Sequence, residues 1–148
     1  MDQVYTDEEC MSVLSKTNPE NAAEYIGKYA SDIFSFDNPF AAYMYSMKDK
    51  KKFVWTDVFN KADISGSYGF KLIDGYKRTN KRDTILRLCL GLELDYQETC
   101  RVLSTVDMAR LRPVHPRDAV IISAILKHIY DIDKINELLI LNNQKPLG

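Results

Sequence analysis

The stretch DISGSYGFKLIDGYKRTNKRD, residues 63–83, decides how the middle of this 148-residue chain folds. The apolar spacing in the preceding segment, 53–63, predicts one short helix. ISGS then predicts a tight turn, in which Ser65 or Ser67 caps a second short helix that ends at Gly75. Two short helices joined by such a turn form a helix-turn-helix. The first helix is expected to point these side chains inward: Val54, Val58 and Phe59.

The charge of the chain is unevenly distributed. Residues 48–82 contain ten Lys and Arg against four Asp, whereas residues 1–47 contain two against eight acidic residues. Residues 83–148 contain eight against nine, which brings the formal net charge of the chain to -1. A basic region between acidic flanks is one footprint of a protein that binds a polyanion. An unevenly charged, solvated surface is the alternative interpretation.

The region from Asn38 to Leu103 resembles the lambda-repressor/Cro-like helix-turn-helix regulators of the xenobiotic-response-element type. The resemblance rests on DISGSYGFKLIDG, on the basic loop after it, and on two further expected helices, RDTILRLCLGLEL and DYQETCRVL. Ile64 and Ser65 match the turn of that family, and Leu72 matches the buried position of its recognition helix. The resemblance implies that the second helix lies in the major groove of DNA.

Three positions depart from the family pattern. Phe59 stands where the first helix has a small residue, and Gly69 stands where the recognition helix has a larger apolar residue. Both positions face the contact between the two helices, so the paired changes conserve the packed volume. Asp63 replaces a glycine before the turn, which is tolerable because Asp visits the left-handed region readily.

The resemblance implies a DNA surface formed by the second helix and the following loop. Hydroxyl, ammonium and aromatic side chains of the helix can reach base edges or a thymine methyl group. The cations of the loop suit phosphates better than bases. Arg, Asn and Gln are missing from the helix itself. The residues predicted to bind DNA are Ser67, Tyr68, Phe70, Lys71, Tyr76, Lys77, Arg78 and Lys81.

The rest of the chain has helix signals and no convincing strand alternation. A capping box in residues 6–9 predicts one helix start. Asn18-Pro19 and Asn38-Pro39 predict two more, because each places a capping residue before a proline at the first helical position. Between them, helical spacing of apolar residues predicts a helix in ENAAEYIGKYASDIF.

An internal repeat occupies the second half of the chain. RDTILRLCLGLELDYQETCRVL begins at Arg82, and RDAVIISAILKHIYDIDKINELL begins at Arg117. With one inserted residue, Asp95 aligns with Asp131, and each predicts the cap of a second helix. We expect two similar helical hairpins that share a core, with each Arg of the Arg-Asp pairs bonded locally. The aligned apolar residues are Ile85-Leu86 with Val120-Ile121, Leu90 with Ile125, and Val102-Leu103 with Leu138-Leu139.

No residue pattern indicates enzyme chemistry. HExxH, GxSxG, the P-loop and the dinucleotide-binding motif are missing, and no His or Cys residues have metal-ligand spacing. We therefore expect no catalytic residue, no metal and no cofactor. Cys10, Cys89 and Cys100 are typical of reduced thiols in helices. An acidic, polar N-terminus and the lack of a long apolar run favour a cytoplasmic protein without a membrane segment.

The sequence thus predicts an all-α helix-turn-helix bundle of about seven to nine helices in a single domain. Within residues 1–148 we expect N-terminal helices in 1–37, the helix-turn-helix core in 38–111 and a C-terminal hairpin in 112–148. The expected function is sequence-specific double-stranded DNA binding by a bacterial or phage-type transcriptional regulator, as a homodimer on a two-fold operator. The alternative is a non-catalytic adaptor in signalling or defence that binds a protein partner, for which the C-terminal hairpin is one surface.

Overall fold

The computed structural model describes residues 11, 15–16, 18–21 and 38–148, and within these it contains seven α-helices and no strand. The all-α prediction is therefore confirmed. The helix start predicted at residues 6–9 lies outside the described residues, and so does most of the helix predicted in ENAAEYIGKYASDIF. At the start predicted at Asn18-Pro19, the described residues form the short 3-10 helix η1. The elements are η1 (Pro19–Asn21), α3 (Pro39–Lys51), α4 (Trp55–Ala62), α5 (Gly66–Ile73), α6 (Arg82–Gly91), α7 (Tyr96–Thr105), α8 (Pro116–Leu126) and α9 (Ile132–Leu141).

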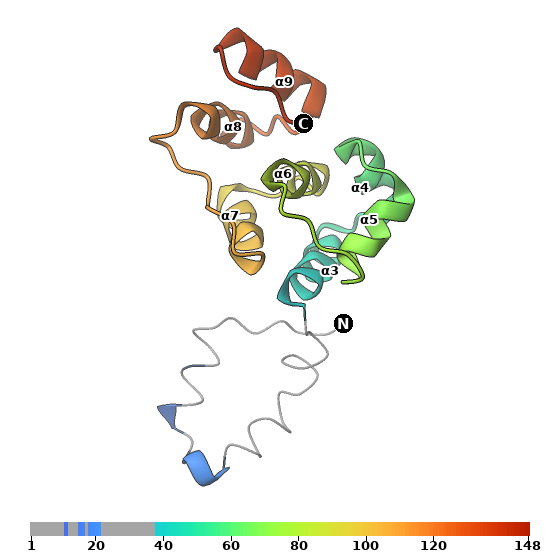
Figure 1. Cartoon of the computed structure of the whole chain (residues 1–148), viewed down its shortest axis with the longest axis vertical. Coiled ribbons are helices and arrows are strands. Elements are labelled where there is room, and N and C mark those ends of the chain that lie inside the picture. Colours follow the sequence, from blue (N-terminus) through green and yellow to red (C-terminus); the bar gives the residue numbers. More distant parts are fainter. Residues whose placement is uncertain (1–10, 12–14, 17, 22–37) are drawn as a thin grey trace.

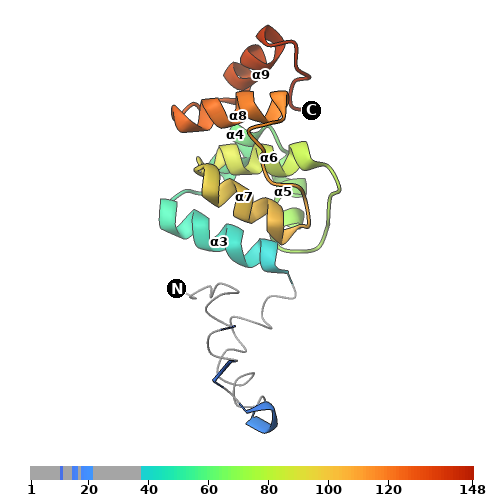
Figure 2. The same ribbon diagram turned by 90° about the vertical axis from the view of Figure 1, so that its left-hand side faces the viewer.

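Helix α6 is the centre of the packing. In both overall views α3, α5 and α7 lie on one side of α6, and α8 and then α9 follow on the other side (Figures 1 and 2). Its side chains are buried on nearly every face, as expected for a helix covered all round. Close contact with α4 depends on Gly91, because a Cβ atom there would lie 2.7 Å from the carbonyl oxygen of Val58.

Local capping signals fix several helix starts as the sequence predicts. The side chain of Asn38 accepts a hydrogen bond from the backbone N–H of Ala41 at 3.1 Å, and Pro39 is the first residue of α3. Asp95 and Glu98 form a complete capping box at the start of α7. One expectation at a helix start is wrong: Val54 is the N-cap of α4 in extended conformation, and its side chain is 58 % exposed rather than inward.

The hairpins α6–α7 and α8–α9 repeat each other in detail. Asp131 caps α9 as Asp95 caps α7. The turn inside each hairpin has a left-handed residue, Glu93 (φ 52°) in the first and His128 (φ 58°) in the second. The single inserted residue therefore lies in the turn of the second hairpin. The aligned apolar positions are buried except Val120 and Leu138, which are partly buried against the core.

The arginines of the two Arg-Asp pairs are not bonded locally, and that part of the prediction is wrong. Arg82 donates from both terminal nitrogens to Asp118 of the second hairpin, at 2.8 and 2.9 Å. Arg117 donates in the same way to Asp83 of the first hairpin, at 2.8 Å for each bond. The arginine of each hairpin thus binds the aspartate of the other hairpin. The two ion pairs join the hairpins at the starts of α6 and α8.

No helix in the described part of the chain has both the length and the apolar character that crossing a bilayer requires.

Candidate functional site

The turn between α4 and α5 has the geometry that the sequence predicts. Asp63 adopts the left-handed conformation with φ 54°, and the N–H of Ile64 donates to the carbonyl of Phe59 at 3.0 Å. Ser65 is the N-cap of α5, since its side chain accepts from the backbone N–H of Tyr68 at 3.3 Å. Ser67 is therefore not the capping residue, and its side chain is exposed on the first turn of α5.

Phe59 and Gly69 form the contact between α4 and α5. A Cβ atom at Gly69 would lie 2.6 Å from a ring carbon of Phe59, so the ring occupies the space that a larger residue would need. The ring of Phe59 also stacks on Trp55, with centroids 5.7 Å apart, and meets the edge of Phe70 at 5.0 Å. The large and small residues compensate across one contact, as expected from the sequence.

Helix α3 fixes the far end of α5. The hydroxyl of Tyr45 hydrogen-bonds to the carboxylate of Asp74, the C-cap of α5. Burial and this hydrogen bond raise the pKa of Tyr45 to about 12, so the phenol remains a donor at physiological pH. Gly75 follows with φ 82°, and a Cβ atom there would lie 2.9 Å from the side-chain nitrogen of Asn38. Both ends of α5 are therefore held by specific contacts.

Most of the predicted DNA-binding residues are exposed in the described part of the chain. Ser67 and Lys71 are one helical turn apart and exposed, and Phe70 between them is 39 % exposed. Tyr68 differs, because it is half-buried against the core beside α6 and is poorly placed for a thymine methyl group. The exposed members of the set in the following loop are Tyr76, Lys77, Arg78 and Lys81.

The basic residues within α3 and α4 differ from those on α5 and in the loop after it. On α3, Lys50 and Lys51 are neutralised by Glu98, with N–O distances of 3.2 and 2.9 Å. On α4, Lys61 pairs with Glu93 at 3.3 Å. No carboxylate in the described residues pairs with the cations on α5, in the loop after it or on the outer face of α6. These unpaired cations are Lys71, Lys77, Arg78, Lys81 and Arg87.

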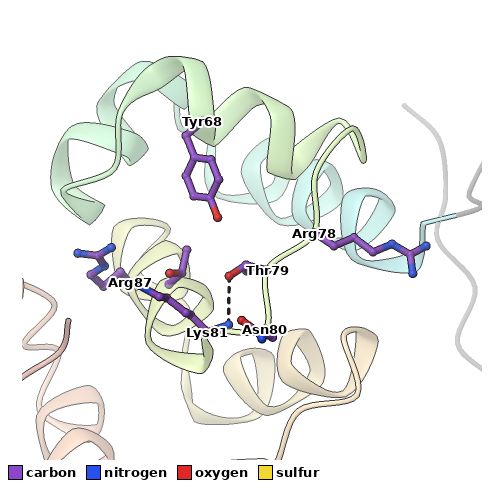
Figure 3. A pocket seen from close by; sticks show the side chains of 7 residues that line it. Tyr68, Arg78, Thr79, Asn80, Lys81 and Arg87 are labelled. Atoms are coloured by element: carbon purple, nitrogen blue, oxygen red, sulfur yellow. Dashed lines mark hydrogen bonds between the residues drawn. The ribbon is translucent and has the colours of Figure 1, made fainter.

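A hollow of about 740 Å³ lies between α5, the basic loop and α6 (Figure 3). The ring of Tyr68 points into it from α5, whereas Arg78 extends away from it. The loop closes on one side through a 3.1 Å hydrogen bond from the N–H of Lys81 to the hydroxyl of Thr79. The residues that line the hollow, which we call the α5–α6 hollow, are Tyr68, Arg78, Thr79, Asn80, Lys81, Thr84 and Arg87.

Four of these residues were not among those predicted from the sequence: Thr79, Asn80, Thr84 and Arg87. A signal for two of them exists in the spacing. Lys81, Thr84 and Arg87 recur at every third residue from the start of α6 and so share one face of that helix. Arg87 stands in the apolar run TILRLCLG, where its neighbours Leu86 and Leu88 are buried core.

Neither thiol in the described region is in a disulfide. Cys89 is buried, which raises the pKa of its thiol, and Cys100 is half-buried. Cys10 lies outside the described residues. Searches of protein-family models, of curated proteins and of solved structures found no significant match to this chain.

Proposed function

We propose that the chain binds double-stranded DNA as a sequence-selective transcriptional regulator of bacterial or phage type. Helix α5 enters the major groove with Ser67 and Lys71 toward the bases, and the loop after Gly75 follows the phosphate backbone. The observation that carries the proposal is that some basic residues are paired with carboxylates and others are not. The lysines of α3 and α4 are paired with carboxylates, whereas those on α5 and in its loop have no carboxylate partner among the described residues.

The geometry of the α4–α5 unit supports the same proposal. A reading helix must be rigid, because base contacts depend on side chains placed within a fraction of an ångström. Helix α5 has a side-chain cap at Ser65, an aromatic contact at Phe59 and a tether from Tyr45 to Asp74. We further propose a homodimer, since regulators with this motif bind two half-sites related by two-fold symmetry.

Salt dependence tests the proposal. A protomer that engages about three to five phosphates shows log affinity falling against log salt with a slope of roughly -3 to -5. Replacing Lys77 and Arg78 together with Ala should weaken binding to every duplex and flatten the slope by about two contacts. The matched control replaces Lys127 and Lys145, two exposed lysines of the second hairpin, and should leave the slope unchanged.

The second candidate is a non-catalytic adaptor that binds another protein. The observation in its favour is a set of large apolar side chains exposed on the C-terminal hairpin and the linker before it. A selection of randomised duplexes at near-physiological salt separates the two candidates. If no sequence is enriched, and a protein partner is captured only while Ile140 and Leu141 are present, the adaptor replaces the regulator. The exposed residues are Val114, Leu126, Ile140 and Leu141.

A further inference from the structure

The α5–α6 hollow has more hydrogen-bond donors than the chain itself satisfies. Thr84 is only 3 % exposed as a residue, but its hydroxyl is not among the shielded polar atoms without a partner and lines the hollow where solvent can reach it. The Nε of Arg87, by contrast, is shielded from solvent and has no hydrogen-bond partner in the described structure. Polar groups at such positions are nearly always hydrogen-bonded in folded proteins. The exception at Arg87, beside the Thr84 hydroxyl on one wall of the hollow, is the observation from which we argue for a ligand group there.

The charge of the hollow determines which group fits. Three cations line it, of which Arg78 extends outward and Lys81 and Arg87 remain at the wall, and none of its described lining residues is a carboxylate. The other polar groups at its wall are hydroxyls and an amide, which can donate hydrogen bonds to oxygen. The phenol of Tyr68 points in from the opposite side (Figure 3). A tetrahedral oxyanion accepts from several donors at once, and an arginine offers it two parallel N–H groups.

We propose that the α5–α6 hollow binds a phosphate group, held by Arg87 and Lys81 and by the hydroxyl of Thr84. The phosphate has two sources, the backbone of a bound duplex or a free phosphate compound. With a duplex as the source, the inference rests on the proposed function and adds Arg87 to the DNA surface. With a free phosphate compound, the same site lies directly beside the reading helix, so its occupancy would compete with DNA for Lys81.

The experiment uses the full chain and two ligands, inorganic phosphate and a DNA duplex. Phosphate is titrated against chloride at constant ionic strength, and the amide resonances of residues 79–87 are followed by NMR. Arg87→Met removes the charge and keeps an apolar stem, and Thr84→Val removes the hydroxyl at nearly constant volume. The control, Arg112→Met, removes one exposed arginine from the linker before α8. Thr84→Val keeps the test decisive if Arg87→Met fails to fold.

Saturable phosphate binding that weakens at least tenfold in Arg87→Met and Thr84→Val, but not in Arg112→Met, supports the site with a free phosphate as the ligand. If only the duplex binds, a salt slope that flattens by about one contact in Arg87→Met supports the site with a backbone phosphate. Duplex binding unaffected by both variants, without phosphate binding, overturns this inference alone. Phosphate binding without duplex binding overturns the proposed function alone. Binding of neither ligand overturns both.

Discussion

Arg82 and Asp118 form a two-pronged ion pair between residues 36 positions apart in the chain. The same arginine donates from Nε to the carbonyl of Ala109 at 2.9 Å, and Asp118 accepts the backbone N–H of Arg112 at 3.0 Å. The ion pair therefore also fixes the chain that leaves the first hairpin. Arg117 fixes the chain that leaves the second hairpin in the same way, because its Nε donates to the carbonyl of Lys145 at 2.8 Å.

Removing either arginine should destabilise the fold, and Arg82 should matter more. The side chain of Asp118 is 7 % exposed, whereas that of Asp83 is 21 % exposed. Because an unpaired charge costs more where water is excluded, Arg82→Met should lower the unfolding free energy by about 3 kcal/mol. Arg117→Met should cost less. Urea unfolding measures both, and Arg112→Met is the control, expected within about 0.5 kcal/mol of wild type. Equal effects of all three variants would show that the ion pairs between the two hairpins do not stabilise the fold.

The two aspartates should make the fold sensitive to acid. Burial raises the pKa of Asp118, but the hydrogen bonds from Arg82 and from the N–H of Arg112 and the charge of Arg82 lower it by more, so its pKa lies below the usual value. The pKa of Asp83 is also lowered: burial raises it, and the bonds from Arg117 and Gly148 outweigh this. A lowered folded-state pKa stabilises the protein above the unfolded value of about 3.9, and this stability is lost as pH falls through the folded pKa.

We therefore expect the unfolding free energy to be nearly constant from pH 7 to pH 5 and to fall steeply below about pH 4. The double variant Asp83→Asn, Asp118→Asn should be less stable at pH 7 but should lose less further stability on acidification. A residual slope should remain, because the pKa of Glu98 is lowered as well: burial raises it, and hydrogen bonds from the N–H of Asp95 and from Lys51 and Lys50 lower it more. If the unfolding free energy of the double variant falls below pH 4 as steeply as that of wild type, these aspartates are not the cause of the acid sensitivity.

Two glycines of α5 should respond oppositely to the same substitution. Gly69→Ala forces a methyl group into the ring of Phe59, and overpacking of this kind costs about 1–3 kcal/mol. Gly66→Ala meets no atom within 4 Å and should be neutral or slightly stabilising, since alanine favours a helix. Adding Phe59→Leu to Gly69→Ala should recover part of the loss. Thermal melting of wild type, the three single variants and the double variant is the measurement, and additive effects of Phe59→Leu and Gly69→Ala would argue against direct contact.

Much of this fold can be predicted because its signals are local. The caps at Asn38, Asp95 and Asp131 each use atoms three residues apart, and the sequence shows both partners together. The left-handed turn at Asp63 is local as well. The second half of the chain is predictable as two hairpins because the pattern occurs twice.

What the sequence does not show depends on contacts between distant segments. An Arg beside an Asp in the sequence favours a local ion pair. Arg82 instead pairs with Asp118, and this pair depends on where the second hairpin lies. Arg87 in an apolar helix gives no sign that it lines the same hollow as Tyr68 of α5. Val54 has helical spacing, yet it precedes the first turn of α4, and its extended backbone points the side chain outward.

Deleting the second hairpin should destabilise the first. Truncation after Arg112 removes Asp118 and Arg117 and leaves Arg82 and Asp83 without their partners. It also uncovers the side of α6 on which α8 lies (Figure 2). We expect a truncated protein that aggregates or melts at a lower temperature. The charge-neutral variant Arg82→Met, Asp83→Asn in the truncated chain should recover part of the stability. A monomeric truncation with an unchanged melting temperature would show that the second hairpin is an independent tail.

Lys71 and the pair Lys77 and Arg78 should affect DNA binding in different ways. Lys71 lies on the exposed face of α5 one turn after Ser67, where a groove-reading side chain belongs, whereas the pair lies in the loop. If Lys71 donates to a guanine, Lys71→Ala should reduce the preference for the best sequence by about 10- to 100-fold, since such a contact discriminates by roughly 1–3 kcal/mol. Replacing Lys77 and Arg78 should instead lower the affinity for all sequences alike. Selection of randomised duplexes with each variant measures both effects. A uniform loss with Lys71→Ala would place this residue on a phosphate and leave the choice of sequence to other side chains of α5.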